Sequence, residues 1–378
     1  MNSVLNAGVI GCGNISNSYL QLAPLFKGFR FTACADLNMD LAQQTASRYE
    51  LQAMSTDALL ADDDIDIVVN LTIPSAHADI SLQALQAGKH VYTEKPLCLN
   101  LAEGRKMQAL AQTNGLRVGS APDTFLGGAH QLARKLIDDG TVGNIVSGSC
   151  HVMGRGMEMW HPNPEFFFKA GGGPVLDMGP YYIANLIQLL GPVRNVTARS
   201  STPFPERTIT SQPHYGDVIQ VETPTTLHAI LEFEQGALIT LSASWDVQAH
   251  GHAPMELYGS KGSLYLPDPN FFGGKVTVTE GKRELYLTTP WEHPFGVANQ
   301  IHGDRALANY RTAGLAEMVL SIHHEQDHMC SLDRALHGVE VLLGIMKSGE
   351  TGTTVKMTTT CERPRALNPE SAALLLNR

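Results

Sequence analysis

The first third of the chain alternates short apolar runs with stretches of helical periodicity. The run 65–71 is apolar on both faces, as expected of a strand that helices cover on each side. The following segment, 78–87, has apolar residues at helical spacing and is closed by Gly88. Strands that alternate with helices predict an α/β fold with a parallel, doubly wound sheet. Its predicted strands are 6–10, 31–35, 65–71, 90–93 and 116–120.

The pattern changes after a predicted helix at 129–139. Apolar and polar residues alternate with a period of two over 227–233 and 239–245, on either side of a turn. This alternation indicates antiparallel strands with one buried face. A second hairpin is predicted for 255–258 and 263–266, and helical spacing returns over 315–322 and 336–346. The second half is therefore predicted as an α+β domain on an open antiparallel (mixed) sheet.

These two patterns predict how the 378 residues divide into domains. We expect a doubly wound domain at 1–122, a second domain at 123–361 and a loosely anchored C-terminal arm at 362–378. Two domains agree with the usual size of roughly 100 to 200 residues per domain.

Composition narrows the possible partners. Apolar residues make up 43% of the chain and charged ones 17%, with a net charge of -10, and no basic stripe could follow a phosphate backbone. Apolar runs are far shorter than the roughly 20 residues of a membrane span, and the N-terminus lacks a cationic region followed by a cleavage site. The six cysteines form no C-x-x-C pair, which argues against a disulfide framework. We expect a cytoplasmic protein that binds neither nucleic acid nor membrane.

A glycine pair joins the first predicted strand to the first helix. Gly11 allows a tight turn, and Gly13 lets backbone N–H groups approach a pyrophosphate at the helix start. Asp36 ends the next strand, where a carboxylate binds the adenine ribose hydroxyls and repels a 2′-phosphate. No cation follows in the next two positions, so we predict NAD, with NADP less favoured. The alternative is that Asp36 only caps the next helix. The predicted contacts at the turn are Gly11, Gly13, Asn14 and Ile15, with Ser16 in place of the third glycine.

Further motifs make the chain similar to a known family. They are the segment 70–74, Tyr-Thr-Glu-Lys-Pro at 92–96, the glycine-rich segment 171–182 and the hairpin 258–263. With the Gly11 turn, they resemble the Gfo/Idh/MocA oxidoreductase family over almost the whole chain. The resemblance implies a Rossmann domain with NAD(P) in the cleft, and an open sheet that forms the interface of a homodimer or homotetramer. It also implies cofactor contacts from Thr72, Pro74, His77, Glu94 and Lys95.

Lys95 has a chemical reason to stand at the end of a strand. Oxidation of a secondary alcohol removes a hydride from carbon and a proton from oxygen, so negative charge develops on that oxygen. An ammonium group within hydrogen-bond reach stabilises this charge. The carboxyl ends of parallel strands are also where ligands bind in such folds. The alternative is a surface lysine beside a turn proline.

Asp177 and Tyr181 are four residues apart and would share one helix face. In many family members a histidine stands at the position of Tyr181. With tyrosine there, this chain resembles the tyrosine-type branch of the family, which includes glucose-fructose oxidoreductase and dimeric dihydrodiol dehydrogenase. A nearby Lys95 would favour the phenolate. We predict Tyr181 as proton acceptor, Lys95 as its electrostatic partner and Asp177 as the group that orients substrate or lysine. Tyr182 is the competing candidate for the role of Tyr181.

Two loops supply further candidates for substrate binding. His161 lies in an aromatic, proline-bounded segment, 160–168, that could stack on a sugar ring, and Asp123 follows the strand at 116–120. A structural role is the alternative for both. The predicted substrate site thus comprises Lys95, Asp123, His161, Asp177, Tyr181 and Tyr182.

One histidine cluster invites a metal interpretation. His324 and His328 share a helical face beside Glu325 and Asp327. Spacing assures no third ligand, so we expect a solvated helix face and no metal site.

Together these features predict an NAD(P)-dependent dehydrogenase acting on CH–OH groups. Its reaction would transfer a hydride between a secondary hydroxyl of a sugar, sugar derivative or cyclitol and the nicotinamide. Two alternatives keep the fold: an NAD-dependent glycosidase that uses transient oxidation, and a non-catalytic regulator that senses NAD and sugars. Release of an aglycone without net formation of NADH would indicate the glycosidase. Binding to a protein partner without turnover of any polyol would indicate the regulator.

Overall fold

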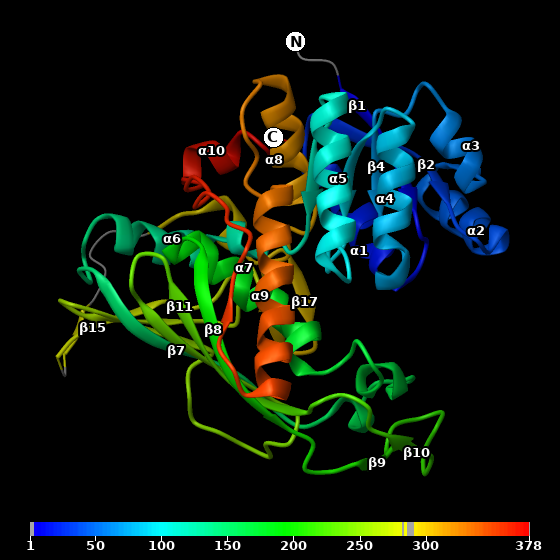
Figure 1. The fold of residues 1–378 in the computed structure, drawn as a ribbon. Coiled ribbons are helices and arrows are strands. Elements are labelled where there is room, and N and C mark those ends of the chain that lie inside the picture. Colours follow the sequence, from blue (N-terminus) through cyan, green and yellow to red (C-terminus); the bar gives the residue numbers. More distant parts are fainter. Residues whose placement is uncertain (1–3, 282, 286–290, 378) are drawn as a thin grey trace.

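The N-terminal part of the chain forms a parallel sheet in the computed structural model, which describes residues 4–281, 283–285 and 291–377 (Figure 1). Its six strands follow the order β3-β2-β1-β4-β5-β6, and every pair is parallel. This order confirms the predicted doubly wound fold. The strands are β1 (Leu5–Ile10), β2 (Phe29–Ala35), β3 (Gln52–Met54), β4 (Ile67–Asn70), β5 (His90–Thr93) and β6 (Val118–Ser120).

Helices cover both faces of this sheet. The helices between its strands are α1 (Asn14–Leu22), α2 (Met39–Tyr49), α3 (Thr56–Ala61), α4 (His77–Gln86) and α5 (Leu101–Asn114). Local sequence fixes their ends: Asn38 and Asn100 accept backbone N–H bonds at the starts of α2 and α5, and Gly115 ends α5 in the left-handed region. All four residues of β4 are buried, as its apolar run predicts.

The second half of the chain is built on a nine-stranded mixed sheet. Only β12 and β7 pair in parallel among its described strands, and the predicted hairpins are the antiparallel pairs β11–β12 and β13–β14. In sheet order the strands are β16 (Arg283–Leu285), β15 (Thr277–Glu280), β14 (Ser263–Leu266), β13 (Met255–Gly259), β7 (Ile145–Met153), β12 (Leu238–Ser244), β11 (Thr226–Phe233), β8 (Val193–Ser201) and β19 (Val355–Lys356). Two small ribbons are β9 (Glu206–Thr208) with β10 (Val218–Gln220) and β17 (Gln300–His302) with β18 (Arg305–Leu307).

Helices pack on one face of the mixed sheet. They are α6 (Gly128–Asp138), α7 (Pro174–Leu190) and α9 (Leu332–Thr351). The residues of β11 alternate between buried and exposed, and Ile230 and Leu238 are about half exposed on the opposite face, at 48% and 50%. Among the described residues, no helix has both the length and the apolar character that crossing a membrane requires.

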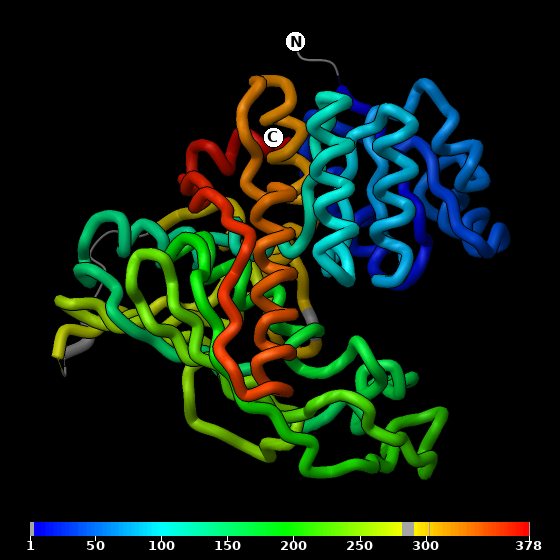
Figure 2. The backbone as a smooth tube through the Cα atoms, viewed as in Figure 1, coloured from blue at the N-terminus to red at the C-terminus, as the bar shows by residue number. Residues whose placement is uncertain are grey.

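Elements from the end of the chain join the two halves. Helix α8 (Ala313–His323) packs Leu315 and Met318 into the core of the parallel sheet. Helix α9 begins at the parallel sheet, where Leu336 packs into the part of the core that α4 and α5 cover. It ends against the mixed sheet, where Ile345 is buried (Figure 2). The spatial units therefore differ from the linear boundaries predicted at 122 and 361, because helical spacing does not reveal which sheet a helix covers.

The prediction of a loosely anchored arm at 362–378 is wrong. The segment runs back beside α9 to the parallel sheet and carries α10 (Pro369–Ala373), with Leu367 and Leu375 buried (Figure 2). Backbone bonds fix its end: Lys27 N donates to Leu375 O at 3.0 Å, and Asn377 N donates to Leu25 O at 2.8 Å. These partners lie far away in sequence, so no local pattern predicts that the C-terminal segment is anchored.

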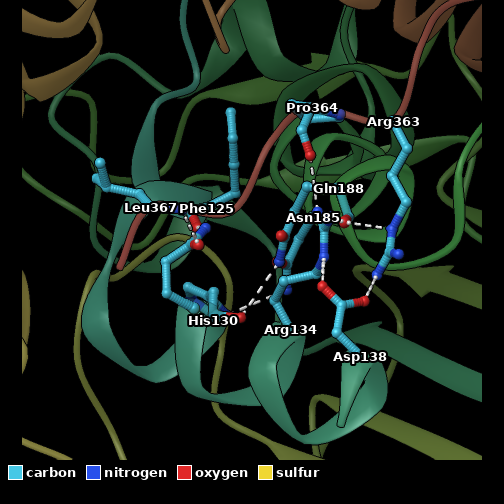
Figure 3. A network of polar contacts seen from close by, with 10 residues as sticks. Phe125, His130, Arg134, Asp138, Asn185, Gln188, Arg363, Pro364 and Leu367 are labelled. Carbon is cyan, nitrogen blue, oxygen red and sulfur yellow. Dashed lines mark hydrogen bonds and ion pairs between the residues drawn. The ribbon is translucent and has the colours of Figure 1, made fainter. Parts of the chain in front are cut away.

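An arginine network holds the start of this segment against α6 and α7 (Figure 3). Arg134 donates from Nε to Asp138 at 2.6 Å, and from Nη1 to the carbonyls of Gln188 at 2.7 Å and Pro364 at 2.8 Å. Arg363 donates to the same Gln188 carbonyl at 3.1 Å and pairs with Asp138 at 2.8 Å. One buried guanidinium thus satisfies acceptors from three segments.

Replacing this arginine tests its contribution to stability. Arg134→Met keeps the bulk of the side chain but removes three hydrogen bonds and leaves the Pro364 carbonyl without its donor, while Arg363 still contacts Gln188 and Asp138. We expect the free energy of unfolding to fall by about 2–3 kcal/mol. Its neighbour Lys135 forms an exposed ion pair with Asp139. Lys135→Met should therefore change the free energy of unfolding by less than about 0.5 kcal/mol. Urea denaturation followed by circular dichroism measures both. Equal losses in the two variants would contradict this role.

Candidate active site

The turn after β1 leaves room for a phosphate group. Gly11 has φ of 99°, and a Cβ there would lie 2.6 Å from the Leu71 carbonyl, so the turn requires glycine. A Cβ on Gly13 would have no atom within 4 Å, and no side chain of the described residues caps α1, which starts at Asn14. Exposed Asn14 and half-buried Ile15 therefore begin a helix that has open space beside Gly13 and no side-chain cap, as a pyrophosphate site requires.

Asp36 lies beside this turn. Its Oδ2 accepts from Cys12 N and its Oδ1 from Asn38 N, both at 2.8 Å. Asn38 caps α2 through its own side chain, so the alternative that Asp36 is the helix cap is wrong. Each carboxylate oxygen has a further lone pair for a ribose hydroxyl. Leu37 next to it is fully exposed and brings no positive charge.

His77 holds two loops of the cleft together. Its ring is 1% exposed, with Nδ1 at 2.6 Å from Pro96 O and Nε2 at 3.0 Å from Thr72 O. The predicted cofactor contact of this ring is not supported, because both nitrogens are turned into the protein. His77 instead fixes the loop that presents Thr72 and exposed Pro74 relative to the loop that carries Lys95.

Glu94 has a similar positioning role. Its Oε1 accepts from the Tyr19 hydroxyl and its Oε2 from Lys95 N, both at 2.8 Å. Both oxygens thus contact the protein, and the carboxylate orders the backbone that leads into Lys95.

Lys95, Asp177 and Tyr181 converge as predicted. The Lys95 ammonium donates to the Asp177 carbonyl oxygen at 2.9 Å and to its carboxylate at 3.3 Å, and it lies 5.2 Å from the centre of the Tyr181 ring. Burial lowers the pKa of Lys95, but Tyr181, Asp177 and Glu94 outweigh this effect and raise it overall. The side chains of Lys95 and Asp177 remain 19% and 24% exposed. The site therefore presents a permanent cation at the carboxyl end of β5 that solvent can reach.

A second cation, Arg311, was missed by the sequence analysis. Burial lowers its pKa, while neighbouring Tyr181 and Asp123 raise it by more. Its guanidinium is held by Asn270, whose Oδ1 accepts from Nη2 at 3.0 Å. Arg311 precedes α8 in an irregular segment that no motif marks, so only the tertiary structure brings it to Tyr181.

Asp123 lies beneath the site and not on its rim, which corrects the prediction. It is 2% exposed, and its Oδ2 accepts from Gly314 N at 3.0 Å. Burial raises the pKa of Asp123 to about 6, against the lowering effects of that bond and of Arg311. Asp123 therefore acts on the site through Arg311.

Tyr182 points away from the cleft. It is 2% exposed in the core of the mixed sheet, and its hydroxyl donates to His151 O at 3.3 Å. Successive residues on a helix are turned by about 100°, so Tyr181 and Tyr182 cannot share a face. The structure assigns the cleft to Tyr181 and removes Tyr182 from the predicted substrate site.

His161 belongs to an aromatic cluster near the cleft. Its Nδ1 accepts from Asn163 N at 3.1 Å, and its ring packs edge-on against Phe167 at 5.0 Å between centroids. The same segment exposes Trp160 and Phe166, at 65% and 59%. These exposed rings, more than His161 itself, offer surfaces for stacking.

A pocket of about 290 Å³ opens beside the Lys95–Asp177 pair. Phe166 and Phe167 line one part of it, and apolar residues of α9 such as Leu342 line another. Neither Tyr181 nor His161 is among its lining residues within the described chain. The pocket therefore places mostly apolar surface next to the cation.

The histidines at the end of α8 do not converge. His324 is exposed, whereas His328 is buried with its Nε2 at 3.0 Å from Val118 O, and burial lowers the pKa of His328 to about 4. The prediction that these histidines lie on a solvent-exposed helix face is therefore wrong for His328.

The open turn at Gly13, the carboxylate of Asp36 beside it and the ammonium of Lys95 are features typical of a dinucleotide-dependent dehydrogenase. A model described as an oxidoreductase family with NAD-binding Rossmann fold matches residues 5–121, and one of the GFO/IDH/MocA C-terminal domain matches residues 130–265. The chain belongs to the Gfo/Idh/MocA oxidoreductase family. Together with the dehydrogenases among its relatives, this supports NAD(P)-dependent dehydrogenase activity.

Curated relatives and solved structures agree with this family. The chain is 27% identical to levoglucosan dehydrogenase of Pseudarthrobacter phenanthrenivorans, over 77% of this chain and 82% of that protein. It is 26% identical to D-xylose dehydrogenase of Paenarthrobacter nicotinovorans, over 75% and 82%. The structure of levoglucosan dehydrogenase with NADH and L-sorbose matches with a TM-score of 0.78 at 22% identity, over 94% of this chain and 99% of that one. At this identity the structural match supports the fold.

The environment of Asp36 predicts the choice of cofactor. Asp36→Ser should raise the KM for NAD at least tenfold, because it removes charge-assisted bonds to the ribose. Adding Leu37→Arg at the exposed neighbouring position should lower the KM for NADP, because it supplies the missing cation. Steady-state kinetics with both cofactors measure this, with exposed Asp40→Ser as the control. An unchanged NAD preference in the double variant would contradict the assignment.

The buried carboxyl of Asp123 predicts a dependence of stability on pH. Its pKa is raised to about 6 from an ordinary 3.8, so the folded protein loses stability as the group ionises. The side chain of Asp123→Asn cannot ionise, so this variant escapes the loss. Its free energy of unfolding minus that of the wild type should therefore increase by up to about 3 kcal/mol between pH 4 and pH 7. Below about pH 3 the difference should not vary with pH, because Asp123 is then protonated in both the folded and the unfolded state. Denaturation at several pH values, with exposed Asp63→Asn as control, tests this; a pH-independent difference would contradict it.

Proposed function

We propose that the protein oxidises a secondary hydroxyl of a sugar, sugar derivative or cyclitol and passes the hydride to NAD. The observation that carries this proposal is the Lys95 ammonium, which contacts Asp177 at 2.9 Å and 3.3 Å and lies over the Tyr181 ring. A fixed cation at this place stabilises the oxygen of an alcohol as its proton leaves. Bound NAD supplies the hydride acceptor.

Each residue of the site has a distinct role in this proposal. Lys95 binds the substrate hydroxyl and holds its developing negative charge. Tyr181 accepts the proton, and the ammonium of Lys95 lies 5.2 Å from the centre of its ring. Asp177 directs the ammonium towards the reacting oxygen. This assignment resembles the tyrosine-type branch of the family.

Two kinds of support favour a carbohydrate substrate. The relatives named above include dehydrogenases of levoglucosan and D-xylose. Exposed Trp160 and Phe166 beside the cleft also suit the apolar faces of a sugar ring.

A glycosidase that uses transient oxidation is the second candidate. The apolar lining of the pocket beside Lys95 favours it, since an aglycone would fit there. Incubation with aryl glycosides distinguishes the two functions: a dehydrogenase accumulates NADH, whereas the glycosidase releases the aglycone without net NADH.

We also propose that the open face of the mixed sheet forms the interface of a homodimer or homotetramer. Apolar Ile230 and Leu238 are about half exposed there, at 48% and 50%.

Substitutions at the proposed catalytic residues test the dehydrogenase. Lys95→Ala should reduce turnover at least 100-fold while NAD affinity stays within a few fold, because it removes a transition-state interaction. Tyr181→Phe should reduce turnover to a similar degree. Tyr182→Phe is the matched control, since this neighbouring tyrosine lies in the core, and should retain activity within about threefold. NADH formation, screened first over monosaccharides, glycosides, aldonates and inositols, is the readout.

The control separates the two tyrosines. A large loss in Tyr182→Phe with full activity in Tyr181→Phe would reverse their roles. Full activity of Lys95→Ala would overturn the proposed function.

A further inference from the structure

A second cluster of polar side chains lies on the mixed sheet, outside the proposed active site. His151 of β7, Glu256 of β13 and His252 of the preceding loop each offer one ligand atom, and all three atoms lie within 4.8 Å of one another. We propose that these three residues bind a divalent cation of the zinc class.

The sheet itself brings two of these ligands together. Strands β7 and β13 are antiparallel neighbours, in which Cys150 faces Met255 and Ser149 faces Glu256. His151 and Glu256 are therefore diagonal neighbours on the face of the sheet that no described helix covers. Two ligands come from paired strands, and so their backbone positions are fixed before any metal binds.

The third ligand comes from an adaptable segment. His252 is exposed in the loop between β12 and β13, next to Gly251, and its ring stacks on His151 with centroids 4.1 Å apart. Ligand atoms bound to one tetrahedral zinc lie about 3.4 Å apart, given bonds of about 2.1 Å. The present separations must therefore shrink by at most about 1.4 Å. Rotation of the exposed His252 side chain can shorten the separations that involve its own ligand atom.

The chemistry of these donors favours zinc over magnesium or calcium. Two imidazoles and one carboxylate form a donor set typical of zinc, with a fourth position open to water. His151 Nδ1 is buried and has no hydrogen-bond partner among the described residues, so one donor atom has no competing contact.

Contacts around the ligands support this arrangement. Glu256 Oε2 accepts from the Tyr258 hydroxyl at 2.7 Å and Oε1 from Ala253 N at 3.2 Å, and these bonds orient the carboxylate as the outer contacts of metal sites do. His250 lies close by, with its ring centroid 6.5 Å from that of His151 and 6.0 Å from that of His252. A bound cation would tie the loop before β13 to the open face of the sheet.

Metal titration of the untagged full-length chain tests this proposal. After removal of metal with EDTA, calorimetric titration with ZnCl₂ should show one saturable site per chain. His252→Ala and Glu256→Gln should each weaken binding at least tenfold. His324→Ala removes an exposed histidine elsewhere and should leave the affinity unchanged. Cobalt(II), which reports ligand geometry through its visible absorption, should show tetrahedral bands that His252→Ala abolishes.

The outcomes separate this site from the proposed active site. Since all three ligands lie away from Lys95 and Tyr181, NAD affinity should be unchanged in each variant, which also confirms folding. No saturable zinc binding by the wild type would overturn the proposal. Wild-type zinc affinity in either His252→Ala or Glu256→Gln would overturn it as well, as would an equal loss in His324→Ala.

Discussion

The contact between Lys95 and Asp177 is the constraint on which the candidate site depends. Lys95 follows β5 of the parallel sheet, and Asp177 lies in the first turn of α7, which packs on the mixed sheet. Their 2.9 Å and 3.3 Å contacts form only if the two halves of the chain keep a fixed relation. Helix α9 and the C-terminal segment, which contact both halves, provide that relation.

This contact serves preorganisation more than stability. A partly exposed ion pair contributes little to folding, because desolvation offsets most of the Coulomb attraction. Asp177 nevertheless fixes where the ammonium of Lys95 lies before substrate arrives, and Glu94 and His77 fix the backbone around it. Charge that is already oriented needs no reorganisation when the alkoxide forms.

Sequence alone predicted the elements and part of the site. Five of the six parallel strands and the hairpins β11–β12 and β13–β14 followed from local periodicity, whereas β3, β7 and β8 were not predicted. Lys95, Asp177 and Tyr181 followed from a strand end, a four-residue spacing and the family resemblance. The direction of a side chain could not be predicted where it depends on tertiary contacts. His77 bridges two loops, and Asp123 is buried beneath the site. Arg311 reaches Tyr181 from a distant irregular segment. The anchored C-terminal segment was missed for the same reason.

The most direct test of the account is chemical rescue of Lys95→Ala by small amines. If the ammonium acts as a positioned cation, ethylamine should enter the space left by the side chain and restore NADH formation in a saturable way, whereas ethanol of similar size should not. Wild-type enzyme should not respond to ethylamine. Equal effects of amine and alcohol, or no rescue in a variant that still binds NAD and substrate, would contradict the central role of this charge.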